Sequence, residues 1–130
     1  MKSVAICGSS RFKLEIKEFT RRLEELGVVV YPPYLFGNPD QDGWKNLTDE
    51  QKKFVALGLT HDHFYKIRMA DVALLFNKDG YAGNSTTLEM GYAVALDKPI
   101  YAISDKDEEI CRHVLFSGFI SSPEELIKFL

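Results

Sequence analysis

The segment VALLFNKDGYAGNSTTLE, residues 72–89, decides the fold. It begins with a continuous apolar run, Val72–Phe76, which is typical of a buried strand. The hydroxyl-rich turn 83–87 then leads into a helix that ends before Pro99. A strand, a turn and a helix in this order bring unpaired backbone N–H groups and one acid, Glu89, to the carboxyl edge of a sheet. The segment therefore predicts a place that can hold an anion and attack a group attached to it.

Apolar runs elsewhere in the chain predict further strands. Residues 3–7 precede Gly8 and predict a first strand. The β-branched run 28–31 predicts a second strand, which the two following prolines end. Residues 99–103 predict a fourth strand, and a fifth is indicated near 114–116 or 119–120.

Helical patterns lie between these strands. Residues 12–26 carry apolar side chains at helical intervals, which predicts a helix with one buried stripe. Thr48, with a glutamine three residues later, predicts a capping box for a helix that runs to residue 70, with Gly58 as a candidate break. The sequence Ser-Pro-Glu-Glu at 122–125 predicts the start of a last helix that ends in the apolar residues 129–130.

The alternation of strands and helices predicts an α/β fold, in which a parallel sheet of 4–5 strands lies between two layers of helices. This is a three-layer α/β/α sandwich of the Rossmann-like or flavodoxin-like kind. Ligands bind such sheets at the carboxyl ends of the strands, where the strand order reverses, which here means the loops after the first and third strands. The 130 residues are expected to form one domain, 1–130.

The overall composition narrows the class of function. A net charge of -3 argues against general binding to nucleic acid. The two cysteines, Cys7 and Cys111, lack a CxxC spacing, so neither a disulfide framework nor a zinc site is predicted. There is no signal-peptide pattern at the start and no apolar run of about 20 residues, so a soluble cytoplasmic protein without membrane contact is expected.

The loop after the first strand contains one candidate anion site. Gly8 allows a sharp turn and a close approach of the backbone to a ligand. Ser9 and Ser10 offer hydroxyl and amide groups at a helix start, and Arg11 offers a guanidinium suited to phosphate or carboxylate. The alternative is an ordinary capped helix with Arg11 in solvent. The loop lacks the GxGxxG pattern, which argues against a nicotinamide cofactor.

The turn before Glu89 contains the second candidate site. Asn84 or Ser85 is predicted to cap the helix, and Thr86 adds a further hydroxyl group. Acids near helix starts are common because the helix dipole stabilises them, so a purely structural Glu89 is the alternative. The small residues at 91, 93 and 95 predict close packing against the sheet, and we therefore expect Glu89 to point into the cleft.

Two histidines precede the third strand. His61 and His63 are two residues apart, so they face different sides of a helix and are not expected to chelate one metal ion. His63 is a candidate acid–base group because histidine ordinarily titrates near neutral pH, with a structural histidine as the alternative. Cys7, at a buried strand end, is expected to be a core residue and not a nucleophile.

Taken together, these residues resemble the nucleoside 2-deoxyribosyltransferase family, which includes the 2'-deoxynucleoside 5'-monophosphate N-glycosidases. The resemblance covers residues 2–104. Its motifs are Cys7-Gly8-Ser9-Ser10-Arg11, Ala70-Asp71-Val72, Ser85-Thr86 ahead of Glu89, Gly91-Tyr92-Ala93 and Lys98-Pro99.

The resemblance implies cleavage or transfer at an N-glycosidic bond. Glu89 would be the nucleophile that attacks C1' of the deoxyribose and expels the base, after which water or a second base takes the sugar. Ser9, Arg11 and Ser85 would bind a 5'-phosphate. No metal and no cofactor is implied, and the partner would be a small nucleoside or nucleotide.

The chain departs from the family pattern at two positions. His63 stands where the family usually has the aspartate that protonates the leaving base, and Gly83 replaces a second frequent aspartate. Histidine would then protonate the base, or the activity is lost. A non-catalytic nucleotide-binding module is therefore an alternative. A more distant resemblance to phosphoribohydrolases adds a ribonucleotide phosphoribohydrolase as another, and the choice between transferase and hydrolase stays open.

The resemblance also implies a homo-oligomer, a dimer or larger. The irregular stretch 34–47 is long enough to act as a lid or a partner contact. Its aromatic residues Tyr34, Phe36 and Trp44 fit an interface between subunits.

Overall fold

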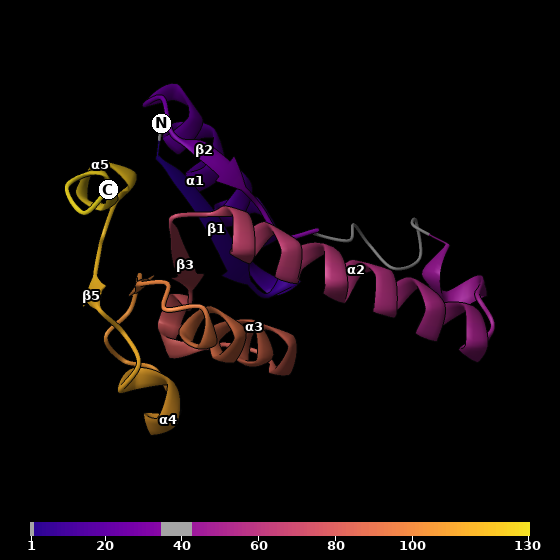
Figure 1. Cartoon of the computed structure of the whole chain (residues 1–130). Coiled ribbons are helices and arrows are strands. Elements are labelled where there is room, and N and C mark those ends of the chain that lie inside the picture. Colours follow the sequence, from indigo (N-terminus) through magenta and orange to yellow (C-terminus); the bar gives the residue numbers. More distant parts are fainter. Residues whose placement is uncertain (1, 35–42) are drawn as a thin grey trace.

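The computed structural model describes residues 2–34 and 43–130, and within them five parallel strands form one sheet in the order β2-β1-β3-β4-β5 (Figure 1). Helices cover both faces, so the predicted three-layer α/β/α sandwich is confirmed. The strand order reverses between β1 and β3, as the sequence predicts. The strands are β1 (Ser3–Gly8), β2 (Val29–Tyr31), β3 (Val72–Phe76), β4 (Ile100–Ala102) and β5 (Gly118–Phe119).

The helices follow the predicted pattern with a few differences. Gly58 does not break its helix, because it is exposed and the surrounding turns continue through it. A short helix that the sequence analysis did not predict precedes the fifth strand, and the last helix ends before the apolar pair 129–130. The α-helices are α1 (Lys13–Glu25), α2 (Asp49–Met69), α3 (Asn84–Ala95), α4 (Ile110–His113) and α5 (Pro123–Ile127), with 3-10 turns at Ser10–Phe12, Trp44–Asn46 and Lys78–Gly80.

Capping interactions explain where two of these helices begin. Thr48 and Gln51 form the predicted capping box at the start of α2. Ser122 caps α5 by accepting a hydrogen bond from the Glu125 amide, with Pro123 at the first helical position, as predicted. None of the helices in the described ranges is both long enough and apolar enough to cross a bilayer.

Side chains alternate between the two faces of the sheet and form two separate cores. One face carries large residues, including Ile6 and Leu74, and packs against α1 and α5. The opposite face is lined by small residues near its centre, and it packs against α2 and α3. These small residues are Ala5, Cys7, Ala73 and Ala102. Because they have little volume, they let the two helices approach the sheet closely.

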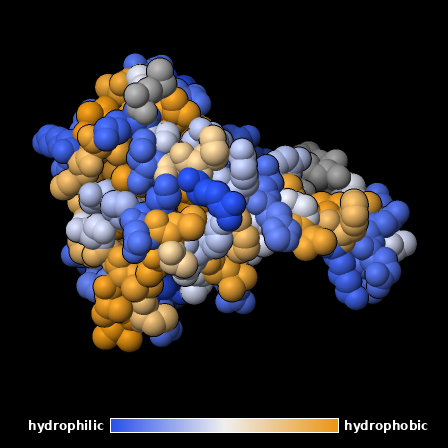
Figure 2. Space-filling model, in the orientation of Figure 1, coloured by the Kyte–Doolittle hydropathy of each residue, from blue (hydrophilic) through white to orange (hydrophobic). Residues whose placement is uncertain are grey.

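Helix α2 projects well beyond the sheet. Its 21 residues give it a length of about 31 Å, and its N-terminal half extends from the body of the molecule (Figure 1). The same projection appears in Figure 2, where apolar and hydrophilic side chains both lie on its visible face. Phe54 and Leu57 in this half are 78% and 58% exposed. The C-terminal half of α2 lies against α3, where the rings of Phe64 and Tyr92 stack with centroids 4.7 Å apart.

The connection between β3 and α3 is held against the loop that follows β4. Gly80, at the end of the 3-10 turn Lys78–Gly80, has φ +81, and a Cβ built on it would lie 1.9 Å from the carbonyl oxygen of Lys106. Nearby, the Asn77 side chain donates to the Ser104 carbonyl and Arg112 forms an ion pair with the buried Asp107. These contacts fix the chain segment that delivers the start of α3 to the edge of the sheet.

We expect Gly80→Ala to destabilise the protein by about 2 kcal/mol or more, because alanine is strained at this φ and its methyl group overlaps backbone atoms. Gly58→Ala is the matched control, since Gly58 lies in an exposed part of α2 and a methyl group added there would meet no other atom within 4 Å. The control should leave stability unchanged or raise it by about 0.5 to 1 kcal/mol. Urea unfolding curves measure both. Equal stability of the two variants would contradict this account of the connection.

Candidate active site

A cleft of about 350 Å³ opens at the carboxyl ends of β1 and β3, where the strand order reverses. Its volume lies at the lower end of the range of about 300 to 1,000 Å³ that small-molecule sites occupy. Segments after β1 and β2, the side of α2 and the start of α3 line it together. The predicted site residues in this lining are Gly8, Ser9, Ser10, His63, Asn84, Ser85, Thr86 and Glu89.

The loop after β1 forms one wall of the cleft. A Cβ on Gly8 would lie 2.8 Å from Ile16 Cδ1 and 3.1 Å from Phe76 Cβ, so the close packing here requires a glycine. Ser9 caps the following 3-10 turn, and its Oγ accepts a hydrogen bond from the Arg11 amide at 3.1 Å. Its hydroxyl hydrogen remains a potential donor toward the cleft.

Arg11 lies outside the lining of the cleft. Its guanidinium carbon lies 3.6 Å from the centroid of the Tyr81 ring, which is a cation–π contact. The tyrosine ring in turn packs edge-on against Phe12. In this position Arg11 covers an aromatic side chain of the neighbouring connection.

The start of α3 forms the opposite wall. The prediction that Asn84 or Ser85 caps this helix is wrong, because both are already inside it and Gly83 is the N-cap. Gly83 has no side chain to accept a hydrogen bond, so no side chain caps the first turn. The unpaired backbone N–H groups of a helix start, together with its dipole, favour a bound anion.

Glu89 lies on the second turn of α3 and lines the cleft, with 15% of its side chain exposed. The sequence predicts this orientation from close packing of the small residues 91, 93 and 95 against the sheet, and that reason is only partly right. Ala93 packs against the sheet, whereas Gly91 and Ala95 are exposed and do not contribute to close packing. Helical periodicity decides the orientation instead, because Glu89 lies next to the buried positions Thr86 and Met90.

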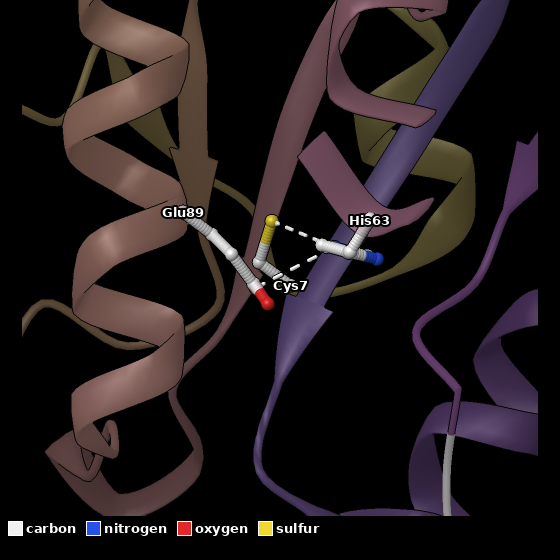
Figure 3. Close-up of side chains that lie close together, drawn as sticks. All are labelled: Cys7, His63 and Glu89. Carbon is white, nitrogen blue, oxygen red and sulfur yellow. Dashed lines mark hydrogen bonds and ion pairs between the residues drawn. The ribbon is translucent and has the colours of Figure 1, made fainter. Parts of the chain in front are cut away.

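The side chains of Cys7, His63 and Glu89 point toward one another (Figure 3), and two of them, His63 and Glu89, line the cleft, so the group lies at its base. They come from three separate elements: the end of β1, the middle of α2 and α3. The sulfur of Cys7 and Nε2 of His63 are 3.5 Å apart, and the same nitrogen is 3.4 Å from Oε2 of Glu89. Cys7 and His63 are 2% and 4% exposed, so both side chains are largely shielded from water, whereas Glu89 keeps contact with the cleft.

Burial sets the protonation states of this group. It lowers the pKa of His63 to about 4, with a further lowering by the charge of Lys66 that Asp62 opposes. Burial also raises the pKa of Glu89 to about 7, although a hydrogen bond with Cys7 acts in the other direction. The pKa of the Cys7 thiol is raised by burial and by the neighbouring Glu89. The expectation that His63 titrates near neutral pH is therefore wrong for this structure, in which the imidazole is neutral at pH 7.

The structure also bears on the predictions made for the histidines of α2 and for Cys7. His61 is exposed while His63 is buried, so the two do face different sides of α2. Tyr92, from the motif Gly91-Tyr92-Ala93, packs against the core beside Phe64. Cys7 is a core residue, as expected, but its contact with His63 and Glu89 was missed. The available signal was its position as the last residue before Gly8 on the strand that leads to the cleft.

In the stretch 34–47, Tyr34 and Trp44 also line the cleft. Phe36, which the sequence analysis assigned to an interface, lies outside the described residues.

Comparisons with known proteins establish the fold. No protein-family model and no curated protein sequence matches the chain. The 2-deoxyribosyltransferase of Bacillus psychrosaccharolyticus matches in structure with a TM-score of 0.65 and 15% identity, over 95% of this chain and 89% of that one.

Two further solved structures share this fold. A CMP N-glycosidase from Clostridium botulinum matches with a TM-score of 0.54 and 20% identity, over 98% of this chain and 97% of that one. A conserved protein from Enterococcus faecalis matches with a TM-score of 0.59 and 16% identity, over 98% and 96% of the two chains. At these identities the likeness establishes a common fold over nearly the whole chain.

The buried carboxyl group of Glu89 has a consequence for stability. A carboxyl group whose pKa is raised on folding costs stability as pH rises from its unfolded value, near 4.5, to its folded value of about 7, and the full cost applies above that. Glu89→Gln removes the charge, so at pH 8 the variant should be more stable than the wild type by about 2 kcal/mol.

Urea unfolding at a series of pH values measures this effect. The exposed Glu24→Gln is the matched control and should change stability little at any pH. A difference between wild type and Glu89→Gln that stays constant from about pH 4 to pH 8 would mean that the carboxyl group is not destabilised by burial.

Proposed function

We propose that this protein cleaves or transfers the N-glycosidic bond of a 2'-deoxynucleoside or its 5'-monophosphate, with Glu89 as the nucleophile. One observation carries the proposal: the Glu89 carboxyl group lines a cleft of suitable size at the switch point of the sheet, 3.4 Å from a buried histidine. The fold, which is that of a 2-deoxyribosyltransferase and a CMP N-glycosidase, supports it. The motifs described in the sequence support membership of the nucleoside 2-deoxyribosyltransferase family.

In the proposed reaction a Glu89 oxygen attacks C1' of the sugar while the bond from C1' to the base nitrogen breaks. His63 donates a proton to the departing base, and a covalent glycosyl ester of Glu89 remains. Water or a second base then attacks C1', releases the sugar product and restores the carboxylate. The reaction needs one nucleophile and one proton donor within reach of the same bond, and the two side chains supply them.

Before the reaction, Glu89 and His63 share one titratable proton. In the resting protein at pH 7, Glu89 carries this proton in a fraction of the molecules, and His63 is neutral. Its transfer to His63 across the 3.4 Å gap produces a carboxylate nucleophile and an imidazolium acid at once. A bound phosphate anion would favour the imidazolium and so promote this state.

The phosphate of a monophosphate substrate fits the two walls of the cleft. Ser9 and Ser10 offer hydroxyl groups on one side, and Ser85 and Thr86 at the uncapped start of α3 offer hydroxyl and amide groups on the other. Asn84 lies at the same helix start. Arg11 remains part of the proposal from the sequence, and to reach the phosphate it would have to leave the Tyr81 ring.

The direct test is incubation with deoxynucleosides, their 5'-monophosphates and CMP, with released base separated by chromatography. We expect base release, and Glu89→Gln should lower kcat by about 1,000-fold or more, because the nucleophile is lost. Digestion and mass spectrometry of acid-quenched enzyme should find one added sugar on the Glu89 peptide. Activity that survives Glu89→Gln would remove Glu89 from the mechanism.

Ser85→Ala tests the phosphate site within the same assay. It should raise KM for a monophosphate and leave the rate with the corresponding nucleoside unchanged, since only the former carries the group that Ser85 binds. The exposed Ser117→Ala is the matched control.

A nucleotide-binding module without catalysis is the second candidate, and one observation favours it. The imidazole at the position of the expected acid has a pKa of about 4 and is a poor proton donor in the resting protein. Nucleotides that raise the melting temperature without any release of base would support this candidate over the enzyme.

We also propose that the protein is a cytoplasmic homodimer whose subunits meet through the projecting half of α2 and the outer side of α3. Phe54, Leu57 and Leu88 there are 78%, 58% and 63% exposed, and a subunit contact would remove these side chains from water. Light scattering should give twice the mass of the chain, and Phe54→Lys should shift the equilibrium toward monomer. The control Lys53→Ala, beside it on α2, should not. A monomeric wild type at micromolar concentration would contradict the proposal.

A further inference from the structure

The three side chains at the base of the cleft form a set of donors that suits a transition metal. Sγ of Cys7, Nε2 of His63 and a carboxylate oxygen of Glu89 all lie within 4.8 Å of one another. Thiolate, imidazole and carboxylate are the three kinds of ligand that zinc takes in proteins. No local motif in the sequence reveals this set, because its members are 56 and 26 positions apart along the chain.

The distances match the edges of a zinc tetrahedron. With Zn–S near 2.3 Å, Zn–N near 2.05 Å and Zn–O near 2.1 Å, tetrahedral angles place sulfur and nitrogen about 3.6 Å apart and nitrogen and oxygen about 3.4 Å apart. The observed separations are 3.5 Å for Cys7 and His63 and 3.4 Å for His63 and Glu89. These two separations already match. The third pair, Sγ of Cys7 and the Glu89 oxygen, lies within 4.8 Å, and it would close to about 3.6 Å around a tetrahedral ion.

The polar atoms of the set are incompletely paired. Oε2 of Glu89 is one of four buried side-chain polar atoms in the described residues that have no hydrogen-bond partner, and it is the one that faces the set. Buried polar atoms are normally paired, so unpaired ones at a functional site point to a missing ligand. Charge also balances, since a thiolate and a carboxylate neutralise a divalent ion and the imidazole stays neutral.

We propose that Cys7, His63 and Glu89 bind one zinc ion, with the fourth coordination position open to the cleft. Binding displaces the thiol proton of Cys7, and the proton of Glu89 where present, to solvent. The sulfur ligand and the small ligand number select zinc over Mg²⁺ and Ca²⁺, which require six or more oxygen ligands. His63 and Glu89 line the cleft, so the ion has a path from solvent.

The consequence for the reaction rests on the proposed function. A zinc ion occupies the Glu89 oxygen and the His63 nitrogen that the glycosidic reaction uses. Zinc binding and attack on C1' therefore exclude each other, and zinc acts as a reversible inhibitor of this enzyme.

Binding is tested first without reference to activity. The full chain, stripped of metal with a chelator, is titrated with Co²⁺ as a spectroscopic probe and then with Zn²⁺. We expect the charge-transfer band of a cobalt–thiolate bond and the intense visible bands of a tetrahedral ion, both abolished when one equivalent of Zn²⁺ displaces the cobalt. Absence of the thiolate band at saturating Co²⁺ overturns the proposal whether or not any variant folds.

Variants then assign the ligands. Cys7→Ser and His63→Gln should each weaken zinc binding by about 100-fold or more, since loss of a ligand costs at least as much as the roughly 10 to 100-fold seen when only a supporting residue is lost. Cys111→Ser and His61→Gln are the matched controls, because both residues are exposed and lie outside the set. Melting curves without metal establish that each variant is folded. Wild-type affinity in a folded Cys7→Ser variant overturns the assignment.

Thermal shifts separate the metals and the two proposals. Zn²⁺ should raise the melting temperature of the wild type, and Mg²⁺ at the same concentration should not. An equal shift with both ions would mean adventitious binding elsewhere and would overturn the site. Base release by chelator-treated enzyme tests the glycosidic reaction independently of zinc. An active enzyme that shows no cobalt–thiolate band would refute only the zinc site. A protein that binds zinc but releases no base would refute only the proposed enzymatic function.

Discussion

The close approach of α2 and α3 to a sheet face made of small side chains is the constraint on which the site depends. Ala5, Cys7 and Ala73 occupy the part of that face beneath the two helices, and larger residues there would push the helices outward. Because the helices lie close, His63 and Glu89 reach over Cys7 and meet within 3.4 Å. The opposite face carries larger residues, including Ile6 and Leu74, and forms the second core against α1 and α5.

This arrangement puts ionisable groups where water is scarce. Burial opposes charge on both members of the pair, which lowers the pKa of His63 and raises that of Glu89. When ionised, such a buried pair lowers the stability of the folded protein. Active sites commonly contain buried ionisable groups that lower stability in this way. In the proposed reaction this cost in stability has a use, since a poorly solvated carboxylate is a stronger nucleophile toward a developing positive centre than one in water.

The same three side chains suit two kinds of chemistry that compete for the same atoms. To act as acid and nucleophile, His63 and Glu89 need one shared proton and room in the cleft for the sugar. As metal ligands, together with Cys7, they need that proton removed and an ion in its place. Cys7 distinguishes the two proposals. It takes no part in the proposed glycosidic reaction, but it supplies the sulfur ligand that a zinc ion prefers.

The sequence by itself determined the order of strands and helices, the capping box at Thr48 and the position of the two loops that form the cleft, because these depend on local periodicity and turn chemistry. It led to a wrong cap for α3, and it did not anticipate that burial lowers the pKa of His63. Only the tertiary structure decided these features and the meeting of Cys7 with residues 56 and 82 positions further along the chain. Contacts of that separation, and the burial that shifts a pKa, arise when distant segments pack together, so no local pattern in the chain contains them.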